Sequence, residues 1–336
     1  GCGSDTGGTG APASSSSVSV TAAVQATSPS TAQSISTSTS TAPSSVSVAE
    51  LQPPHGRITT RAGDVFAVGV DGDVWVLSGV TDDAPSGAVR LADLADPRVE
   101  PRKGPGADHV DAIVGPIDGS VFFTDCCEPV SGNLYAVTEA GGERQLLAPG
   151  GRVAARPDGR RLATVNTYAL AVIDLDTGRA TTRVFTDVGS QIAGEADVLW
   201  SADGASVVVL DAGVDQLRLV RFDATGSLEQ VGTTVASFAP RSASSWVRFA
   251  GRGPNGEIVV AIRESNATVF RWFDATTLGE VDPLVRRLEG AISSVQFGAD
   301  GRSLLWTAGG VVNYRSADGP LRATGPGYAG AWFTTR

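Results

Sequence analysis

The chain has 336 residues, with 36 acidic side chains against 26 Lys and Arg, and a formal net charge of −10. This charge disfavours a nucleic-acid partner, because phosphate binding needs a basic surface. Hydrophobic residues make up 41% of the chain, enough for a sizeable core, yet no run approaches the roughly 18–20 apolar residues that span a bilayer. The length allows two ordinary domains or one large all-β domain.

Residues 1–50 are predicted to be a disordered tether. The stretch 3–48 has no aromatic residue and one charge, Asp5, so it cannot bury enough apolar surface to offset the entropy of ordering. Its Ser, Thr and Ala content and its prolines favour an extended linker. The folded part is therefore expected at 51–336.

Gly1-Cys2 resembles the end of a bacterial lipobox, where a small residue precedes the cysteine that receives a diacylglyceryl group. The resemblance implies that Cys2 is a lipid anchor. Buried acyl chains would hold the N-terminus at a membrane with about 0.8 kcal/mol per CH₂ group. We therefore expect an extracytoplasmic protein that is lipid-anchored to the cell membrane; the alternative is an unmodified cysteine.

From residue 57 onward, short β-rich runs alternate with Asp-Gly or Asn-Gly turns at intervals of about 40–50 residues. Each unit reads as strand, tight turn, strand, strand, second turn and fourth strand. The glycines permit a positive φ, and the Asp side chains can bond their own downstream backbone. The first hairpins are expected at 112–125, 153–166, 198–211, 247–262 and 294–308, with turns ending at Gly119, Gly159, Gly204, Gly256 and Gly301. The second turns end at Gly142, Gly178, Gly226, Gly279 and Gly319.

Four short strands per repeat predict a β-propeller. Residues 63–79 and 87–94 supply three strands and residues 325–336 supply one, so together they complete a sixth blade and remove a free sheet edge. The sequence thus predicts an all-β, monomeric six-bladed propeller whose first blade is closed by the C-terminal strand. Six aromatic residues are expected where blades pack face to face: Phe122, Trp200, Phe249, Phe297, Trp306 and Trp332.

The turn Pro-Asp-Gly-Arg-Arg-Leu-Ala at 157–163 resembles those of the TolB-like and YVTN-like propellers of bacterial envelopes. The preference for Arg over Lys, with Lys103 the single lysine, resembles proteins of GC-rich actinobacteria. Together with Cys2, these resemblances imply an actinobacterial envelope lipoprotein. They concern the fold and its location, and a propeller fold does not assign an activity.

Cys126 and Cys127 are adjacent, in the connection between the second and third strands of the second blade. If Cys2 carries a lipid, these two remain as a pair, and paired cysteines of exported proteins are usually disulfides. A disulfide between Cys126 and Cys127 is the first interpretation. Two free thiols are the second, and a metal site is the third because it needs further ligands in a chain with two His.

Candidate binding residues fall at the predicted mouth of the central channel, six residues before the Asp of each first turn. They form a mixed set rather than the oxygen cage that Ca²⁺ requires, so two interpretations stay open: solvated loop residues without a function, or a recognition rim. The matching positions are Ala112, Arg152, Asp197 and Ser294, with Trp246 roughly matching in the fifth unit, and their charged neighbours are Asp108, His109, Asp111 and Glu195.

We expect a non-catalytic binding or scaffold module for a protein, peptide or glycan of the cell envelope, with no cofactor and no metal. The alternative is a metal-dependent hydrolase or lactonase at the channel, because six-bladed propellers include calcium-dependent lactonases. A Ser-His-Asp triad is disfavoured, since no Gly-x-Ser-x-Gly segment supplies a nucleophile.

Overall fold

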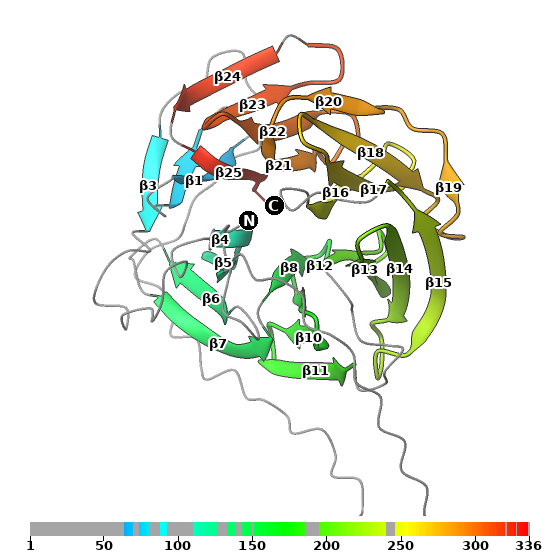
Figure 1. Cartoon of the computed structure of the whole chain (residues 1–336). Coiled ribbons are helices and arrows are strands. Elements are labelled where there is room, and N and C mark those ends of the chain that lie inside the picture. The colour runs from blue at the N-terminus through cyan, green and yellow to red at the C-terminus, as the bar shows by residue number, and fades with distance from the viewer. Residues whose placement is uncertain are drawn as a thin grey trace, which may run out of the picture. The chain divides into compact units, whose positions relative to one another are not determined.

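The structure is a computed structural model of the chain. It describes residues 64–69, 74–78, 80, 88–92, 110–125, 133–138, 143–149, 151–185, 195–239, 246–319, 321–326 and 328–334. These residues form strands and turns, and no helix among them could cross a membrane. The strands form six sheets around a central axis (Figure 1), which confirms the predicted six-bladed β-propeller. The predicted tether, 1–50, lies outside the described residues.

Five blades are built from consecutive strands, each blade running outward from its inner strand. Blade II contains β4 (Val110–Ile117), β5 (Ser120–Asp125), β6 (Asn133–Thr138) and β7 (Glu143–Pro149). Blade III contains β8 (Arg152–Ala155), β9 (Arg161–Val165), β10 (Ala169–Asp174) and β11 (Arg179–Val184). Blade IV contains β12 (Glu195–Trp200), β13 (Ser206–Ala212), β14 (Gln216–Asp223) and β15 (Gln230–Ser237). Blade VI contains β21 (Ile292–Phe297), β22 (Leu304–Ala308), β23 (Val311–Arg315) and β24 (Leu321–Pro326).

Blade V departs from the four-strand pattern. It contains β16 (Val247–Arg252), β17 (Ile258–Arg263) and β18 (Ala267–Phe273), but its outer edge is divided between β19 (Glu280–Val281) and β20 (Arg287–Glu289). The short strands pair with opposite ends of β18, and residues 282–286 pass between them outside the sheet. The blade therefore has an interrupted outer edge.

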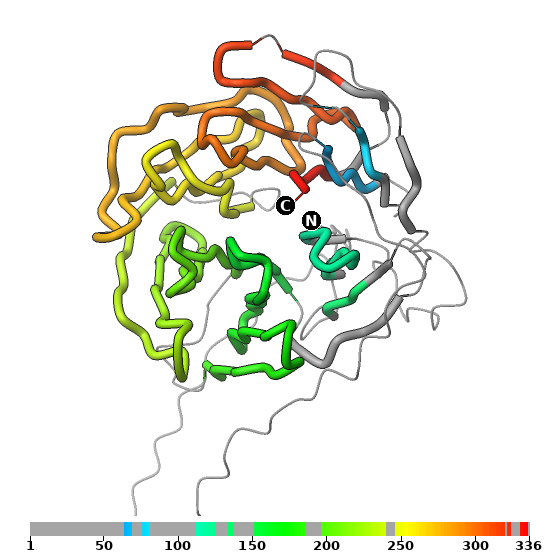
Figure 2. Tube along the Cα trace, turned by 180° about the vertical axis from the view of Figure 1, so that it is seen from behind, coloured from blue at the N-terminus to red at the C-terminus, as the bar shows by residue number. Residues whose placement is uncertain are grey.

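Blade I joins the two ends of the folded part. It contains β1 (Val65–Gly69), β2 (Val74–Leu77) and β3 (Ala88–Ala92), with β25 (Tyr328–Phe333) antiparallel to β1 as the inner strand. Figure 1 shows the red β25 beside the blue β1. The predicted closure by the C-terminal strand is confirmed. The inner strands contact one another in the order β25, β4, β8, β12, β16 and β21, and β21 returns to β25; Figure 2 shows the same ring from behind.

The hydrophobic core is divided into six clusters, each between the faces of two adjacent blades. Central strands such as β13 and β17 are therefore buried on both faces, and both are rich in Val and Ile. Outer strands such as β15 alternate between exposed and half-buried residues. The aromatic predictions are confirmed: Phe122, Trp200, Phe297 and Trp306 are buried, and Phe249 and Trp332 pack against the clusters.

The first turns follow the prediction, whereas the second turns follow it in part. All five predicted glycines, from Gly119 to Gly301, have a positive φ. Among the described second turns Gly178 has one, but Leu228 and Leu278 replace Gly226 and Gly279 in the left-handed conformation. Both leucines are almost fully buried in the blade interfaces, and this burial offsets a conformation that disfavours side chains.

The predicted Asp bonds are present in the second turns. In blade III, Thr177 donates its N–H and its hydroxyl to Asp174 Oδ1 at 2.9 and 2.8 Å. In blade V, Thr277 donates the same two groups to Asp274 Oδ1 at 2.7 and 2.9 Å. These bonds hold the pKa of both carboxyls below the ordinary value and fix the turn locally.

Arginine side chains bridge adjacent blades by donating to backbone carbonyls. Arg156 Nε of blade III donates to Gly204 O at 3.0 Å, and Arg221 Nη1 of blade IV donates to Thr276 O at 2.8 Å. A guanidinium stays charged and carries five donors. It can therefore satisfy carbonyls of a neighbouring turn that the strand ladders do not reach.

The turn glycines allow a matched test of blade packing. A Cβ on Gly301 would lie 2.2 Å from the Gly253 carbonyl carbon of blade V, whereas a Cβ on Gly256 meets no atom within 4 Å. Gly256→Ala should cost about 1–2 kcal/mol for its left-handed backbone, and Gly301→Ala about 1–3 kcal/mol more because the two turns must separate. Chemical denaturation of the two variants measures the difference. Equal losses of stability in the two variants would show that the turns of blades V and VI can separate at no cost.

Candidate functional site

A row of polar residues lies at one level on the inner strands of blades III to VI. In the strand ladders Arg152 faces Val165, Asp197 faces Leu210 and Ser294 faces Thr307. In all three blades, the two paired residues lie the same number of positions from the glycine that ends the first turn. The row lies towards the end of the ring where the inner strands begin, which we call the rim end.

In blade V this level is occupied by Arg248 and not by Trp246. A register shift between Phe249 and Gly251 places Arg248 opposite Ala261, and Gly251 has a φ of 110°. Trp246 lies two positions earlier, before the start of β16. A count of positions from the turn does not reach Arg248, because a bulge adds one residue to the strand between the turn and the row; Gly251 is the residue in the sequence that could have indicated it.

Asp197 lies at the centre of the row and is 8% exposed. Its Oδ2 accepts the Phe249 N–H of blade V at 2.8 Å, and its Oδ1 accepts the Val198 N–H at 2.8 Å. Burial raises the pKa of this carboxyl, while the charges of Arg152 and Arg248 and the two N–H donors oppose the rise. Asp197 thus connects two inner strands, and both of its oxygens are engaged.

Ser294 and Gln296 connect β21 to the closing strand. Ser294 Oγ accepts the Ala331 N–H at 3.0 Å, and Gln296 Oε1 accepts the Phe333 N–H at 2.7 Å. Ser294 also donates to Thr307 Oγ1 at 3.0 Å. The structure therefore gives Ser294 a role in ring closure, and its binding role stays a prediction.

The channel row does not resemble a cation cage. Within the described part of the chain, no three His, Cys, Asp or Glu side chains are grouped as metal ligands. The carboxylate of Asp197 has arginines on both sides, and these repel a divalent cation.

Several predicted residues cannot be placed. Cys2, Asp108, His109, Cys126 and Cys127 lie outside the described residues, so the lipid anchor and the disulfide stay predictions. Asp111 and Glu195 belong to β4 and β12, but their side chains are outside the description. Ala112 faces Thr124 in blade II and is buried in the cluster between blades II and III. The other predicted rim residues are in the row described above, apart from Trp246.

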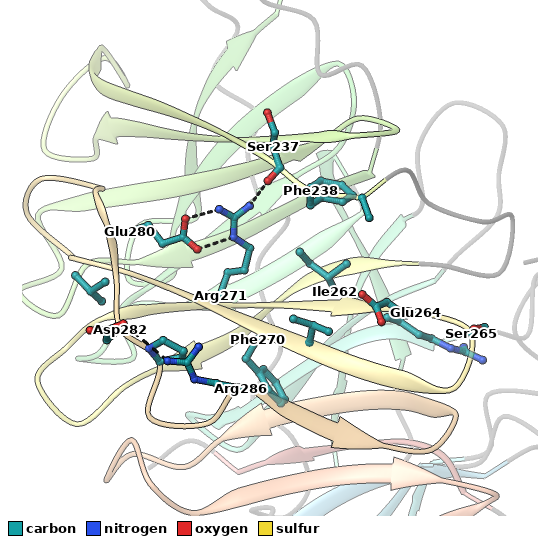
Figure 3. A pocket seen from close by; sticks show the side chains of 15 residues that line it. Ser237, Phe238, Ile262, Glu264, Ser265, Phe270, Arg271, Glu280, Asp282 and Arg286 are labelled. Carbon is teal, nitrogen blue, oxygen red and sulfur yellow. Dashed lines mark hydrogen bonds and ion pairs between the residues drawn. The ribbon is translucent and has the colours of Figure 1, made fainter.

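A cavity of about 1210 Å³ lies between blades IV and V. Its walls come from the end of β15, from β17 and β18, and from the segment between β19 and β20 (Figure 3). Phe238, Ile262, Phe270, Val281 and Pro283 supply apolar surface. We call it the blade IV–V cavity.

Ion pairs surround the apolar surface of the cavity. Arg271 binds Glu280 through two nitrogens, with Nε to Oε1 at 2.8 Å, and its Nη1 donates to Ser237 O at 2.6 Å (Figure 3). This arginine thus connects β18 to both β19 and blade IV. Bonds of this forked kind fix the position of both partners, so this side of the cavity is preorganised.

The sequence alone does not indicate this cavity. The segment Val281-Asp282-Pro283-Leu284 reads as an ordinary connection in an expected fourth strand. Pro283 does indicate an interruption of the fourth strand, because a proline inside a strand cannot donate a hydrogen bond to its neighbour. The distance between blades IV and V at their outer edges could not be read from the chain.

The strand order and the inward row define a six-bladed β-propeller with a mixed-charge channel. No protein-family model matches the sequence, and no curated protein matches it significantly. TolB from Acinetobacter baumannii is similar in structure, with a TM-score of 0.49 and 14% identity over 81% of this chain and 67% of that chain. A Lactobacillus plantarum protein has a TM-score of 0.48 and 14% identity over 79% of this chain and 81% of that chain. Periplasmic gluconolactonase from Pseudomonas aeruginosa has a TM-score of 0.42 and 13% identity over 80% of this chain and 98% of that chain.

The raised pKa of Asp197 predicts a pH-dependent stability. The folded state holds this proton more tightly than the unfolded state, whose pKa is about 3.9. The associated stability is present below that value and is lost as pH rises through the folded pKa. Asp197→Asn should cost about 1–3 kcal/mol, because the amide can accept one of the two N–H bonds.

The deficit of Asp197→Asn should become smaller as pH rises above 4, since the variant does not titrate. Urea denaturation of both proteins from pH 4 to pH 8 measures it. A deficit that grows with pH would mean that Arg152 and Arg248 outweigh burial.

Proposed function

We propose that the propeller is a binding module that holds an extended peptide segment of an envelope partner in the blade IV–V cavity. The cavity carries this proposal, because it combines apolar walls with oriented charged groups. Ligand pockets of about 300–1,000 Å³ hold drug-sized molecules. At about 1210 Å³ this cavity can hold several residues of a peptide.

The interrupted edge of blade V supports a peptide over a small metabolite. β19 and β20 cover the two ends of β18, and the Phe270 N–H between them bonds to Arg286 O at 2.9 Å. The connecting segment carries the exposed Leu284 and ends beside the cavity. Because β19, β20 and Arg286 already occupy this edge, a peptide would be recognised through its side chains by the pocket beside it.

The residues of the central channel do not favour the alternative function, a metal-dependent hydrolase or lactonase. A metal-dependent lactonase needs oxygen ligands that are free to bind a cation. Both oxygens of Asp197 accept backbone N–H groups, and Arg152 and Arg248 place positive charge beside it. A non-catalytic role at the cavity is therefore the function we propose.

We further propose that Cys2 carries a lipid and that residues 1–50 tether the propeller at the outer side of the cell membrane. The Gly-Cys pair and the nearly uncharged Ser, Thr and Ala stretch support this location. Such an anchor would confine the binding module to partners in the envelope.

Filling the cavity should abolish peptide binding. Peptides selected from a random library on the full chain should bind Ala239→Trp at least tenfold more weakly than the wild type, because the indole would occupy the exposed Ala239 position in the cavity wall. Fluorescence polarisation of the synthetic peptides measures the affinity. Val214→Trp is the control, since Val214 is 67% exposed and outside the cavity. Equal binding to both variants, or a library without binders, would overturn the site.

The lipid anchor can be tested directly by mass spectrometry of the N-terminal peptide from envelope fractions of the producing cells. A diacylglyceryl mass on Cys2, and release of the Cys2→Ser variant from the membrane fraction, are the expected results. An unmodified Cys2 in membrane-associated protein would contradict the anchor.

A further inference from the structure

Blade IV has an outer edge that differs from the other outer edges that the structure describes. Outer strands are usually kept from pairing with other chains by charged residues, by proline or by a short length. β3, β11 and β20 contain arginine, β7 and β24 contain arginine and proline, and β19 has two residues. β15 has eight residues and contains neither a charge nor a proline. Its edge is therefore open to an added strand.

Every second residue of β15 directs its backbone groups away from the sheet. The Phe238 N–H bonds to Asp215 O of blade IV at 2.9 Å, and the pairing of β14 with β15 is regular towards that end. Pairs with and without hydrogen bonds alternate along antiparallel strands. The N–H and C=O groups of Thr233, Val235 and Ser237 therefore point outward.

The bond from Arg271 supports this direction at Ser237. Arg271 Nη1 of blade V donates to Ser237 O at 2.6 Å, because that carbonyl points away from β14. The outward backbone groups of Thr233 and Val235 have no hydrogen-bond partner among the described residues. Both side chains are exposed, that of Val235 by 58%. Two N–H and two C=O groups are thus available to a neighbouring chain.

The open edge leads into the blade IV–V cavity. Ser237 and Ala239 belong to the wall of this cavity, and so does Arg271, which binds Ser237 O (Figure 3). A chain that pairs with Thr233 and Val235 therefore reaches the cavity within a few residues. On the other side of the cavity, β19 and β20 already cover the edge of β18.

We propose that the partner peptide binds as a fifth strand on β15, with its main chain bonded to Thr233 and Val235 and one end in the blade IV–V cavity. In strand addition, main-chain bonds give affinity and pockets for alternate side chains give specificity. The peptide is uncharged and β-branched where it lies beside Val235, since such cross-strand pairs are stabilising. Its residue in the cavity is apolar, because Phe238 and Ile262 line that space.

This inference rests on the proposed use of the cavity as a peptide site and adds how the main chain of the peptide is held. A peptide fits the edge better than a second copy of the chain does. The β15 strand of another copy belongs to a rigid sheet and cannot leave it to enter the cavity. Two copies would also repel each other, because each has a net charge of −10.

Backbone methylation tests main-chain recognition on the full chain. The probes are the hexapeptide N-acetyl-Leu-Thr-Val-Thr-Val-Leu-amide and two forms with a methyl group on the backbone nitrogen of the third or of the fourth residue. Only alternate N–H groups of a paired strand face its neighbour, so one methylated form should bind at least tenfold more weakly and the other nearly normally. Calorimetry measures the affinities. Equal affinities, or no binding of the unmethylated hexapeptide, would overturn the proposal.

Two proline variants assign the peptide to β15. Val235→Pro removes an outward N–H and blocks the edge without removing a bond to β14. Thr182→Pro is the matched control on β11 of blade III, because the bond from the Phe185 N–H to Tyr168 O places the Thr182 N–H outward as well. Val235→Pro should bind the hexapeptide at least tenfold more weakly, and Thr182→Pro should bind it normally. The methylated probes need no variant, so they decide the question if either proline lowers the ligand-free thermal midpoint.

The outcomes distinguish this inference from the proposed function. Peptides that lose affinity for Ala239→Trp but bind Val235→Pro normally would sustain the cavity and overturn the added strand. Loss of affinity in Val235→Pro alone would sustain the strand and overturn the cavity as the peptide site. A wild-type dimer in light scattering that Val235→Pro converts to a monomer would identify a second copy on the edge and overturn the peptide.

Discussion

The pairing of β25 with β1 is the constraint on which the rest of the structure depends. The core consists of six clusters between blades, so every blade needs a neighbour on both faces. An open ring would expose the apolar faces of two blades to water. Ser294, Gln296 and the bond from Thr334 Oγ1 to Asp64 O at 3.1 Å add contacts from neighbouring segments to this closure. Residues more than 250 positions apart thereby hold every other interface in place.

Polar residues near the axis serve mainly to connect the blades. Asp197 accepts an N–H from blade V, and Trp200 Nε1 donates to Ala154 O of blade III at 3.0 Å. Arginines farther out donate to carbonyls of the next blade in the same manner. The bond of Asp197 thus occupies a side chain that the sequence alone assigns to recognition.

The interruption of the outer strand in blade V explains the position of the cavity. Blades diverge with distance from the axis, and a continuous outer strand such as β15 follows the sheet to its edge. In blade V the chain leaves β18 at Asp282 and returns at Arg287, while Trp272 Nε1 donates to Val285 O at 3.0 Å and holds the detour. The space beside blade IV then stays open, and Arg271 fixes its wall.

The number of blades and their closure are properties that the sequence alone predicts. Asp-Gly turns at regular intervals mark the strand ends, because the backbone conformation of a turn depends on the few residues within it. The sequence also predicts the buried aromatics, because alternating apolar runs must face a neighbouring blade. Tertiary structure decided what the local pattern leaves undefined. Burial put Leu228 and Leu278 in the left-handed conformation that glycines were expected to adopt, and the register of β16 put Arg248 in the channel row. The cavity depends on the distance between the outer edges of blades IV and V, which the order of residues along the chain does not specify.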